Sequence, residues 1–335
     1  MSRTLKVGVL GGGSWGTTVA SLVSRNAPVT LWARNPETVA EINSKHTNEV
    51  YLPGAKLPEK LVATHDIAEA VATSDVIIMG IPSHNFRPVL TEVKKHIRAW
   101  VPVISLTKGL ELETGMRMTQ VINEVLPGHP VGVLTGPNLA REIMAGQAAA
   151  SVIAMEDEII VRELQSLFSS GLFRVYTNSD VIGCELGGVL KNIIAIAVGM
   201  GDGQGAGDNT RSALITRGLA EVTRLGVAMG GKAETFSGLA GMGDMIATCT
   251  SPQSRNRHVG VELGKGRNMQ DIVEEMVMVA EGAKSASAVM ALAKKYNVVM
   301  PIATDVSRVV GGDSDARRAF RGLLRVSAGA ESEPG

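Results

Sequence analysis

The sequence predicts a chain that is α/β in its first half and all-α in its second, with a doubly wound parallel sheet followed by an all-helical C-terminal domain. Short apolar runs alternate with helical patterns as far as Asn178. A glycine-rich turn directly follows the first run, and no further run of β-branched residues occurs after Asn178. Such alternation indicates crossover units and a parallel sheet, whereas long stretches at helical spacing indicate helices packed on one another.

The first apolar run, Val7–Leu10, leads at once into a G-x-G-x-x-G pattern made of Gly11, Gly13 and Gly16. A strand that turns into a helix over glycines leaves backbone N–H groups at the positive end of the helix dipole, facing a pyrophosphate. A helical pattern follows, and a second strand is expected over Pro28–Ala33. The pattern predicts a dinucleotide site on a Rossmann-like sheet. An ordinary tight turn between a strand and a helix is the alternative.

Five further apolar runs, each bounded by turn residues, are predicted as strands of the same sheet: Leu61–Thr64, Val76–Ile81, Val103–Leu106, Val131–Leu134 and Ala150–Met155. Ligands of a doubly wound sheet bind beyond the carboxyl ends of its strands, so the residues after each run are candidates for a site. Two such ends combine turn residues with polar side chains: Ile81-Pro82-Ser83 and Thr107-Lys108-Gly109.

The sequence pattern changes near residue 180. Helices are predicted over Asp180–Met200, Ser212–Met229, Glu281–Tyr296 and Pro301–Val310. Glycine clusters at Gly199–Gly207 and Gly238–Gly243 are expected to break helices. The expected domains are residues 1–180, which bind the dinucleotide, and residues 181–326, a helical substrate and catalytic domain. Residues 327–335 are expected to form a frayed polar tail.

The overall composition excludes several classes of function. Lys plus Arg equals Asp plus Glu, with 33 of each, so no global field attracts nucleic acid or a membrane surface. Aromatic residues make up only 3% of the chain, which leaves few stacking platforms for bases. The two cysteines, Cys184 and Cys249, provide neither a disulfide framework nor metal-ligand spacing, so no metal is expected.

The location of the protein is predicted from its apolar segments. The most apolar stretch, Ile193–Met200, is shorter than the ~20 residues of a membrane span. The first strand begins too early, and is too short, to be the apolar region of a signal peptide. We expect a soluble cytoplasmic protein that acts on small molecules, without a nucleic-acid partner and without membrane insertion. The oligomeric state is left open, and a homodimer is one alternative.

Arg34 follows the second predicted strand about 20 residues after the glycine turn, where an NAD-preferring enzyme usually has an acidic residue for the ribose hydroxyls. No Asp or Glu occurs between Trp32 and Pro36. Because a guanidinium pairs with a 2′-phosphate, we expect NADP(H) as the preferred cofactor and NAD(H) as the alternative cofactor. A solvated surface arginine is the other interpretation of Arg34.

Two lysines are candidates for proton chemistry. Lys191 lies in the middle of a predicted helix among apolar neighbours, so its ammonium group must either extend to solvent or end in a polar pocket. Burial would move its pKa toward the working range of a general acid or base. The alternative is a structural lysine bound by carbonyls at a helix end. Lys108 follows the fifth strand, where a surface or helix-capping lysine is the alternative to a site residue.

Polar residues near two helix starts suggest a binding site. Asp244 follows two glycines and precedes an apolar helix, so it either caps that helix or pairs with a catalytic lysine. The segment Ser254–His258 places hydroxyl, guanidinium and amide groups before the helical run Val259–Leu263. Such a cluster at a helix N-terminus suits a phosphate or carboxylate, and a solvated basic cap is the alternative.

Taken together, these segments resemble the bacterial NAD(P)-dependent glycerol-3-phosphate dehydrogenase family over nearly the whole chain. The resemblance is carried by ordered motifs: Gly11–Gly16 (GGGSWG), Ser105–Gly109 (SLTKG), Leu134–Asn138 (LTGPN), Glu185–Asn192 (ELGGVLKN), Ile215–Glu221 (ITRGLAE), Leu239–Asp244 (LAGMGD), Ser254–Arg257 (SRNR) and Glu281–Gly282 (EG). Chance agreement of so many motifs in one order is negligible.

The resemblance implies two sets of site residues. The nucleotide would be bound by the glycine turn and by Ser14, Trp15, Arg34, Lys108, Ala140, Arg255, Val279 and Glu281. The glycerol phosphate would be bound by Lys108, Gly136, Asn138, Lys191, Asp244, Ser254, Arg255 and Asn256. Position 138 departs from the family, which usually has Ser or Thr there. Asparagine can still donate and accept a hydrogen bond.

The resemblance also implies the reaction, which is interconversion of sn-glycerol 3-phosphate and dihydroxyacetone phosphate for phospholipid synthesis. Hydride moves between C2 of the alcohol and the nicotinamide, and the C2 oxygen exchanges a proton with a protein group. We assign that exchange to Lys191, tuned by Asp244, and expect Lys108 to orient or polarise the oxygen. The segment Ser254–Asn256 would hold the phosphate, so that remote binding energy positions the reacting carbon.

Two other interpretations are weighed against this one. A β-hydroxyacid or 6-phosphogluconate dehydrogenase shares the domain order but typically spaces its lysine and asparagine as K-x-x-x-N, whereas here Ala195 holds the fourth position after Lys191. A non-catalytic NADP-sensing protein would keep the glycine turn and Arg34 without needing a lysine pair. Lys108, Lys191 and Asp244 together disfavour a sensor.

Overall fold

The computed structural model describes residues 4–276 and 280–323, which form two compact units. The first comprises the described residues up to Thr107 together with Met116–Val181. The second comprises Lys108–Gly115 and the described residues from Ile182 onward. Lys108–Gly115 thus belongs to the second unit although it lies between strands of the first along the chain. The expected tail at residues 327–335 lies outside the described residues.

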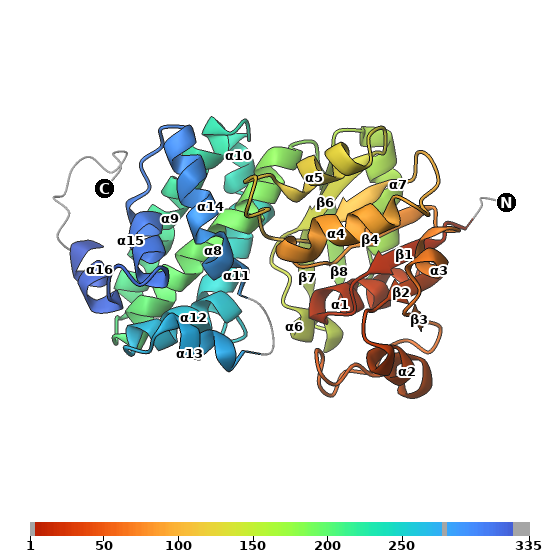
Figure 1. The fold of residues 1–335 in the computed structure, drawn as a ribbon, viewed down its shortest axis with the longest axis horizontal. Helices are drawn as coiled ribbons and strands as arrows, with labels where there is room; N and C mark the ends of the chain where they lie inside the picture. The colour runs from red at the N-terminus through yellow and green to blue at the C-terminus, as the bar shows by residue number, and fades with distance from the viewer. Residues whose placement is uncertain (1–3, 277–279, 324–335) are drawn as a thin grey trace. The chain divides into compact units, whose positions relative to one another are not determined.

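The first unit contains one eight-stranded sheet with the order β3-β2-β1-β4-β5-β6-β7-β8 (Figure 1). Its strands are β1 (Val7–Leu10), β2 (Val29–Trp32), β3 (Val62–Thr64), β4 (Val76–Met79), β5 (Val103–Ser105), β6 (Val131–Thr135), β7 (Ala149–Met155) and β8 (Phe173–Asn178). Neighbouring strands from β3 to β6 are parallel, which confirms the doubly wound fold class.

Two strands differ from the prediction. The strand β7 runs antiparallel to β6, and the connection between them contains the five-residue helix α6 (Ala140–Met144). The strand β8, which pairs parallel with β7, is missing from the predicted set. In β8, buried Phe173 and Val175 alternate with exposed Arg174 and Tyr176. This period of two gives no continuous apolar run.

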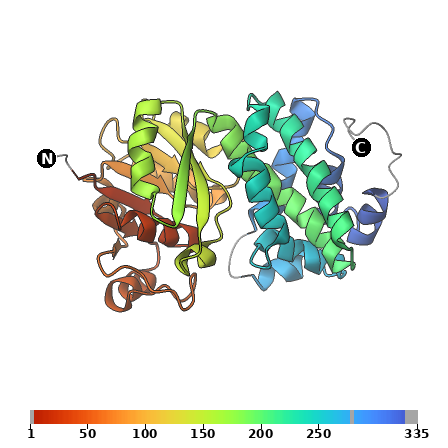
Figure 2. The ribbon, with the colours of Figure 1, turned by 180° about the vertical axis from the view of Figure 1, so that it is seen from behind.

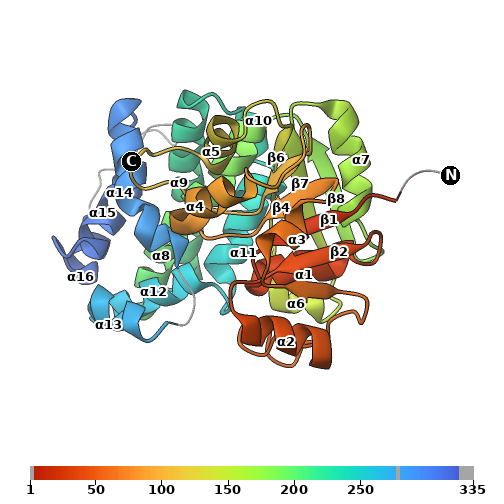
Figure 3. The same ribbon diagram turned by 45° about the vertical axis from the view of Figure 1, so that its right-hand side comes forward.

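Helices cover both faces of the sheet. Helices α1 (Ser14–Val23) and α7 (Glu158–Phe168) pack on one face, where Val9, Val19 and Leu164 share a core (Figure 2). Helices α3 (Ile67–Val71), α4 (Ser83–Val93) and α5 (Met118–Val125) cover the other face (Figure 3). The remaining helix of this unit is α2 (Pro36–Lys45). The carboxyl ends of the parallel strands and the start of α1 therefore meet at one edge.

The second unit is all-α in the part of the chain that the structure describes, as predicted. Its helices are α8 (Val181–Gly203), α9 (Asp208–Ala228), α10 (Ala233–Phe236), the π-helix η1 (Leu239–Gly243), α11 (Asp244–Thr250), α12 (Arg255–Gly264), α13 (Met269–Glu274), α14 (Glu281–Lys295), α15 (Pro301–Val310) and α16 (Ala316–Leu323). Side chains of α8 such as Ile193, Ile196 and Met200 lie in the core of this unit.

The predicted break at the glycine cluster Gly199–Gly207 falls in its second half, since α8 ends at Gly203 and Gly207 is the N-cap of α9. Gly199 itself lies inside α8, where a Cβ would lie 2.1 Å from the Arg257 carbonyl oxygen, and a Cβ at Gly203 would lie 2.3 Å from that of Val261. The glycines let α8 and α12 touch through their backbones. The 23-residue helix is also long enough, with mean hydropathy 1.8 over an 18-residue window, to meet the length and composition of a membrane span. However, 94% of that window is buried inside the protein, as in the core helix of a soluble protein.

Candidate active site

The glycine turn between β1 and α1 has the geometry of a phosphate-binding turn. A Cβ at Gly11, where φ is +124°, would lie 2.4 Å from the Gly80 carbonyl oxygen, and one at Gly16 would lie 2.0 Å from that of Gly11. These two glycines allow strand, turn and helix to pack closely. At Gly13, in contrast, no heavy atom of a described residue lies within 4 Å of the Cβ position, its own neighbours along the chain aside. The turn therefore packs tightly against the protein at Gly11 and Gly16 and is accessible at Gly13.

The open side of this turn fits a pyrophosphate. Gly13 is the N-cap of α1, no side chain caps the helix, and its first turn holds no acidic residue. The Gly13 N–H donates no hydrogen bond to a described residue, and the buried Trp15 Nε1 atom has no partner among the described residues. A helix start with unsatisfied donors and a positive dipole end attracts an anion. Ser14 and Trp15 are the first two residues of the helix.

Arg34 is exposed just after β2, next to Asn35, whose side chain caps α2. No hydrogen bond or ion pair of the Arg34 guanidinium occurs within residues 4–276 and 280–323. The side chain can therefore take a 2′-phosphate without first breaking an internal pair.

The end of β6 brings two other predicted residues to the same unit. Gly136 has φ +130°. The Asn138 amide donates to Ser151 Oγ at 3.3 Å, and that hydroxyl donates to the Thr135 carbonyl oxygen at 2.7 Å. Asn138 Oδ1 and Thr135 Oγ1 are buried without a partner among the described residues. Buried polar atoms of this kind suit a polar ligand. Ala140 follows as the first residue of α6.

In the second unit, two lysines bind opposite oxygens of one carboxylate. Lys108 Nζ lies 2.7 Å from Asp244 Oδ2, and Lys191 Nζ lies 3.0 Å from Asp244 Oδ1. Lys191 also donates to Thr248 Oγ1, which lies 3.3 Å from Asp244 Oδ1. Gly243 rather than Asp244 is the N-cap of α11, and the Lys191 ammonium binds side chains rather than helix-end carbonyls. Lys191 and Asp244 therefore form an ion pair with each other, and neither serves to cap a helix.

The lysine–aspartate cluster is buried and carries more positive than negative charge. Lys191 and Asp244 are 4% and 2% exposed, so their charges interact with little screening by water. The pKa of Lys108 is lowered to about 8, mainly by burial and to a smaller extent by the positive charges of Lys191 and Arg255, while Asp244 opposes the shift. Two ammonium groups around one carboxylate leave a net positive charge. The negative charge of a phosphate ester would neutralise this excess positive charge.

Ser254 and Asn256 also belong to a hydrogen-bonded frame. Ser254 Oγ accepts from Arg257 N at 3.2 Å and so caps α12. The Asn256 amide donates to Asn192 Oδ1 at 2.9 Å and accepts from Gly282 N at 3.0 Å. The Asn192 amide donates to the Lys108 carbonyl oxygen at 3.1 Å. This chain of contacts ties the start of α12 to the backbone of Lys108.

Arg255, between those two residues, is exposed on the first turn of α12. Glu281 is the first residue of α14 and is close enough to interact electrostatically with Arg255. Val279, the remaining predicted cofactor residue, lies outside the described residues.

Sequence reasoning missed two residues of this cluster, Thr248 and Asn192. Thr248 lies four positions after Asp244 on one helix, a spacing that puts both side chains on one face and could have revealed the pair. Asn192 adjoins Lys191 but contacts the Lys108 backbone, which only the tertiary structure shows.

Cys249 is a buried free cysteine in the core of the second unit. Burial raises the pKa of its thiol to about 12, so it stays protonated near neutral pH. Among the described residues, no group of three His, Cys, Asp or Glu side chains could hold a metal ion.

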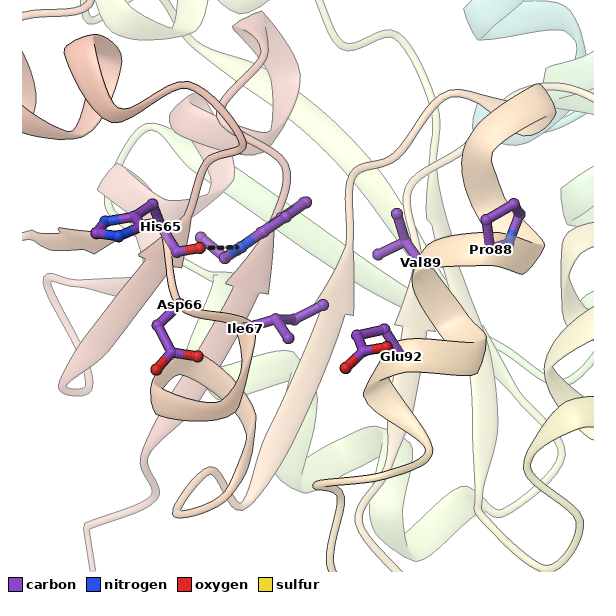
Figure 4. Close-up of a pocket in the computed structure, with 7 residues that line it drawn as sticks. His65, Asp66, Ile67, Pro88, Val89 and Glu92 are labelled. Atoms are coloured by element: carbon purple, nitrogen blue, oxygen red, sulfur yellow. Dashed lines mark hydrogen bonds between the residues drawn. The ribbon is translucent and has the colours of Figure 1, made fainter.

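A separate cavity of about 600 Å³ lies in the first unit near the carboxyl ends of β2 and β3 (Figure 4). It is lined by Trp32, His65, Asp66, Ile67, Pro88, Val89 and Glu92. The Trp32 indole donates to the His65 carbonyl oxygen at 3.1 Å. No predicted site residue lines this cavity, and its two carboxylates would repel a phosphate.

Known proteins are similar to this chain in sequence and fold. Residues 6–161 match the family model of the NAD-dependent glycerol-3-phosphate dehydrogenase N-terminus, and residues 180–321 match that of its C-terminus. Glycerol-3-phosphate dehydrogenase (NAD(P)+) 2 of Sphingopyxis alaskensis is 71% identical over 99% of each chain. The Mycobacterium avium enzyme of that name is 53% identical over 98% of this chain and 97% of its own.

A crystal structure of glycerol-3-phosphate dehydrogenase from Coxiella burnetii superposes with a TM-score of 0.93 at 37% identity, covering 96% of this chain and 99% of the other. The two family models, the high identity over the full length and the fold agree with the resemblance stated from the motifs. The chain belongs to the glycerol-3-phosphate dehydrogenase family of NAD(P)-dependent oxidoreductases.

Proposed function

We propose that this chain reduces dihydroxyacetone phosphate to sn-glycerol 3-phosphate with NAD(P)H, reversibly, and so supplies glycerophospholipid synthesis in the cytoplasm. The observation that carries the proposal is the buried Asp244 carboxylate held between Lys108 and Lys191. The pair combines a proton carrier with a positive charge, which reduction of the ketone of a phosphate ester needs.

The dinucleotide would be held by the glycine turn, with its pyrophosphate at Gly13 and its 2′-phosphate at Arg34. Ser14, Trp15 and Ala140 would complete that site, together with Lys108, Arg255, Val279 and Glu281. The Arg34 guanidinium, which has no partner among the described residues, supports NADP(H) as the preferred form. When bound, the nicotinamide supplies or accepts the hydride.

In this proposal Lys191 donates a proton to the C2 oxygen when the ketone is reduced and accepts it in the reverse direction. Asp244 keeps the Lys191 ammonium in place through the 3.0 Å contact. Lys108 polarises the C2 oxygen. Since the pKa of Lys108 is about 8, it is positively charged near neutral pH and loses that charge under alkaline conditions.

The substrate phosphate would bind Arg255 at the start of α12. Ser254 and Asn256 support this site, since both side chains make internal contacts that fix the first turn of the helix. Gly136 and Asn138 are proposed as further contacts to the substrate. The free polar atom Asn138 Oδ1 supports that role.

The domain roles are part of the same proposal. Residues 1–180 would bind the cofactor, and residues 181–326 would bind the substrate and carry the catalytic groups, with Lys108–Gly115 assigned to the second role. We propose that the enzyme acts without membrane insertion, as a homodimer or as a monomer.

One assay separates this function from its rivals. NADPH oxidation is followed with dihydroxyacetone phosphate, and NADP+ reduction is followed with 6-phosphogluconate and with hydroxyisobutyrate. The proposal expects turnover of dihydroxyacetone phosphate alone. Turnover of either hydroxyacid would identify a different dehydrogenase, and nucleotide binding without turnover of any substrate would identify a sensor.

A further inference from the structure

Asn48 is a fully buried polar residue that contacts the glycine turn. It lies in the loop after α2 and is 0% exposed. Its Nδ2 atom donates to the Gly12 carbonyl oxygen at 2.9 Å and to Thr17 Oγ1 at 3.0 Å. Because a carbonyl oxygen can only accept, the contact with Gly12 fixes which end of the amide faces the turn. Both N–H groups of the amide are therefore directed at the turn and at α1.

The other end of this amide is left unsatisfied. Asn48 Oδ1 is buried and has no hydrogen-bond partner among the described residues. An unpaired buried carbonyl costs free energy, so an asparagine that served the fold alone is expected to be bound at both ends. Only the Nδ2 end of the Asn48 amide is hydrogen-bonded, and one of its two partners is the backbone of the glycine turn.

The direction of the Gly12–Gly13 peptide follows from this contact. The described peptide bonds are all trans, so the carbonyl of Gly12 and the N–H of Gly13 point in opposite directions. Because Asn48 binds the Gly12 carbonyl, the Gly13 N–H points away from Asn48. Gly13 is also the residue of the turn whose Cβ position is open. We propose that Asn48 is a positioning residue that orients the Gly13 N–H toward the cofactor pyrophosphate. This inference rests on the proposed placement of the pyrophosphate at Gly13.

Orientation matters here because both residues of the peptide are glycines. Glycine adopts many backbone conformations, so a free Gly12–Gly13 peptide can rotate its N–H away from the ligand. The apparent dissociation constant rises in proportion as the fraction of competent turns falls. NADPH and NADH carry the same pyrophosphate, and loss of Asn48 must weaken both by an equal factor.

The test compares Asn48→Ala with the matched variant Asn43→Ala. The Asn43 side chain also bridges to backbone, donating to Ala63 O at 2.9 Å and accepting from Ala63 N at 2.8 Å, but it does not contact the turn. For Asn48→Ala we expect the dissociation constants of NADPH and NADH to rise together by roughly 3- to 10-fold. The kcat at saturating cofactor and the KM for dihydroxyacetone phosphate should stay within about twofold. Asn43→Ala should leave both dissociation constants unchanged.

Two further variants keep the inference separate from the placement of the pyrophosphate and from failure to fold. Gly13→Ala adds a methyl group into open space at a φ of −74°, so it should fold and still weaken both nucleotides. If it does not weaken them, the proposed cofactor site is wrong. Thr17→Val removes only the second acceptor and should raise both constants by a smaller, equal factor.

A single pattern overturns the role of Asn48 alone. In that pattern Gly13→Ala weakens nucleotide binding, while Asn48→Ala and Thr17→Val lower kcat or the melting temperature without changing either dissociation constant.

Discussion

At the scale of single residues, the three charges of the lysine cluster depend on one another. Lys108 and Lys191 each bind a different oxygen of Asp244, which is almost completely buried. Loss of one lysine leaves the carboxylate with a partner, whereas loss of Asp244 leaves two ammonium groups with mutual repulsion. Breaking a buried pair in this way is costly because the remaining charge stays desolvated.

Lys191→Met keeps much of the side-chain volume but removes the proton carrier. We expect kcat for dihydroxyacetone phosphate reduction to fall by ~10²–10⁴, with the dissociation constant of NADPH little changed. Lys265→Met, at an exposed lysine bound to Glu262, serves as the control and should keep full activity. A Lys191→Met variant with near-wild-type kcat would exclude Lys191 as the acid or base.

Arg34→Ala tests the choice of cofactor. Only NADPH carries the 2′-phosphate, so KM for NADPH should rise and KM for NADH should stay almost unchanged. One charge-assisted contact of ~1.5–3 kcal/mol corresponds to roughly 10- to 100-fold. Steady-state kinetics with both cofactors check this, with the exposed Arg25→Ala as control. Equal effects on the two cofactors would contradict the assignment.

Arg255→Ala tests the phosphate site. Loss of one member of a desolvated charge pair costs roughly 2–5 kcal/mol, and part of this should appear in kcat because phosphate binding also positions C2. We expect a large fall in kcat/KM for dihydroxyacetone phosphate and little change for dihydroxyacetone, which has no phosphate. Proportional losses with both ketones would show that Arg255 serves the cofactor or the fold instead.

At the scale of elements, helices of the second unit are fixed by contacts at their ends and at glycines. The backbones of α8 and α12 meet where Gly199 faces Gly260, and a Cβ at Gly260 would lie 2.1 Å from the Ile196 carbonyl oxygen. This contact sets the position of α12, and with it the start of the helix that carries Arg255, relative to the helix that carries Lys191.

The start of α15 is capped from another helix. The buried Glu221 side chain of α9 accepts from Ile302 N at 2.7 Å and from Ala303 N at 3.2 Å. Burial raises the pKa of Glu221 to about 7, against the lowering effect of these backbone contacts and of Arg224. The Glu221 carboxylate therefore binds the free N–H groups at the start of α15, although burial disfavours its negative charge.

Glu221→Gln should change the pH dependence of stability. Because the folded state raises the carboxyl pKa from 4.5 to about 7, the stability from this group is fully present below pH 4.5 and is lost as the pH rises through 7. Between pH 5 and 8 the wild-type unfolding free energy should fall relative to the variant by at most about 3 kcal/mol. Denaturant unfolding at both pH values measures this, with exposed Glu37→Gln as control. An equal difference at both pH values would contradict the buried titration.

At the scale of the whole molecule, each compact unit has a hydrophobic core of its own. Val9, Leu31 and Phe173 belong to a core of the first unit, and Ile193, Phe236 and Val289 to that of the second. The glycine turn exists only when β1 and α1 are folded. A nucleotide that binds there stabilises the native state at the expense of the unfolded chain.

NADPH should therefore raise the free energy of unfolding by ~2.7 kcal/mol when its free concentration is 100 times its dissociation constant. Thermal unfolding with and without the nucleotide measures the shift. Gly13→Ala should reduce it at the same NADPH concentration. A full shift in Gly13→Ala would place the nucleotide away from the turn.

Much of the fold can be predicted from the sequence alone. Continuous apolar runs identified β1 and β4, because strands buried on both faces carry no polar residues. It did not identify β8, whose alternating pattern belongs to an edge strand, or the antiparallel direction of β7, which only its pairing with β6 shows. It also did not show that Gly199 lies inside α8, because the backbone that requires a glycine there belongs to Arg257, far away along the chain.

For the site, the sequence determined the chemical groups, and the tertiary structure decided their pairing. The motifs around Gly13 and Lys191 each occupy a short segment of the chain, so the turn or helix that they form can be predicted from that segment. The contacts of Asp244 with Lys108 and of Asn48 with Gly12 join residues 136 and 36 positions apart. The packing of helices and loops determines which groups meet. A buried charge or amide then needs a partner, because an unpaired polar group in the interior costs free energy.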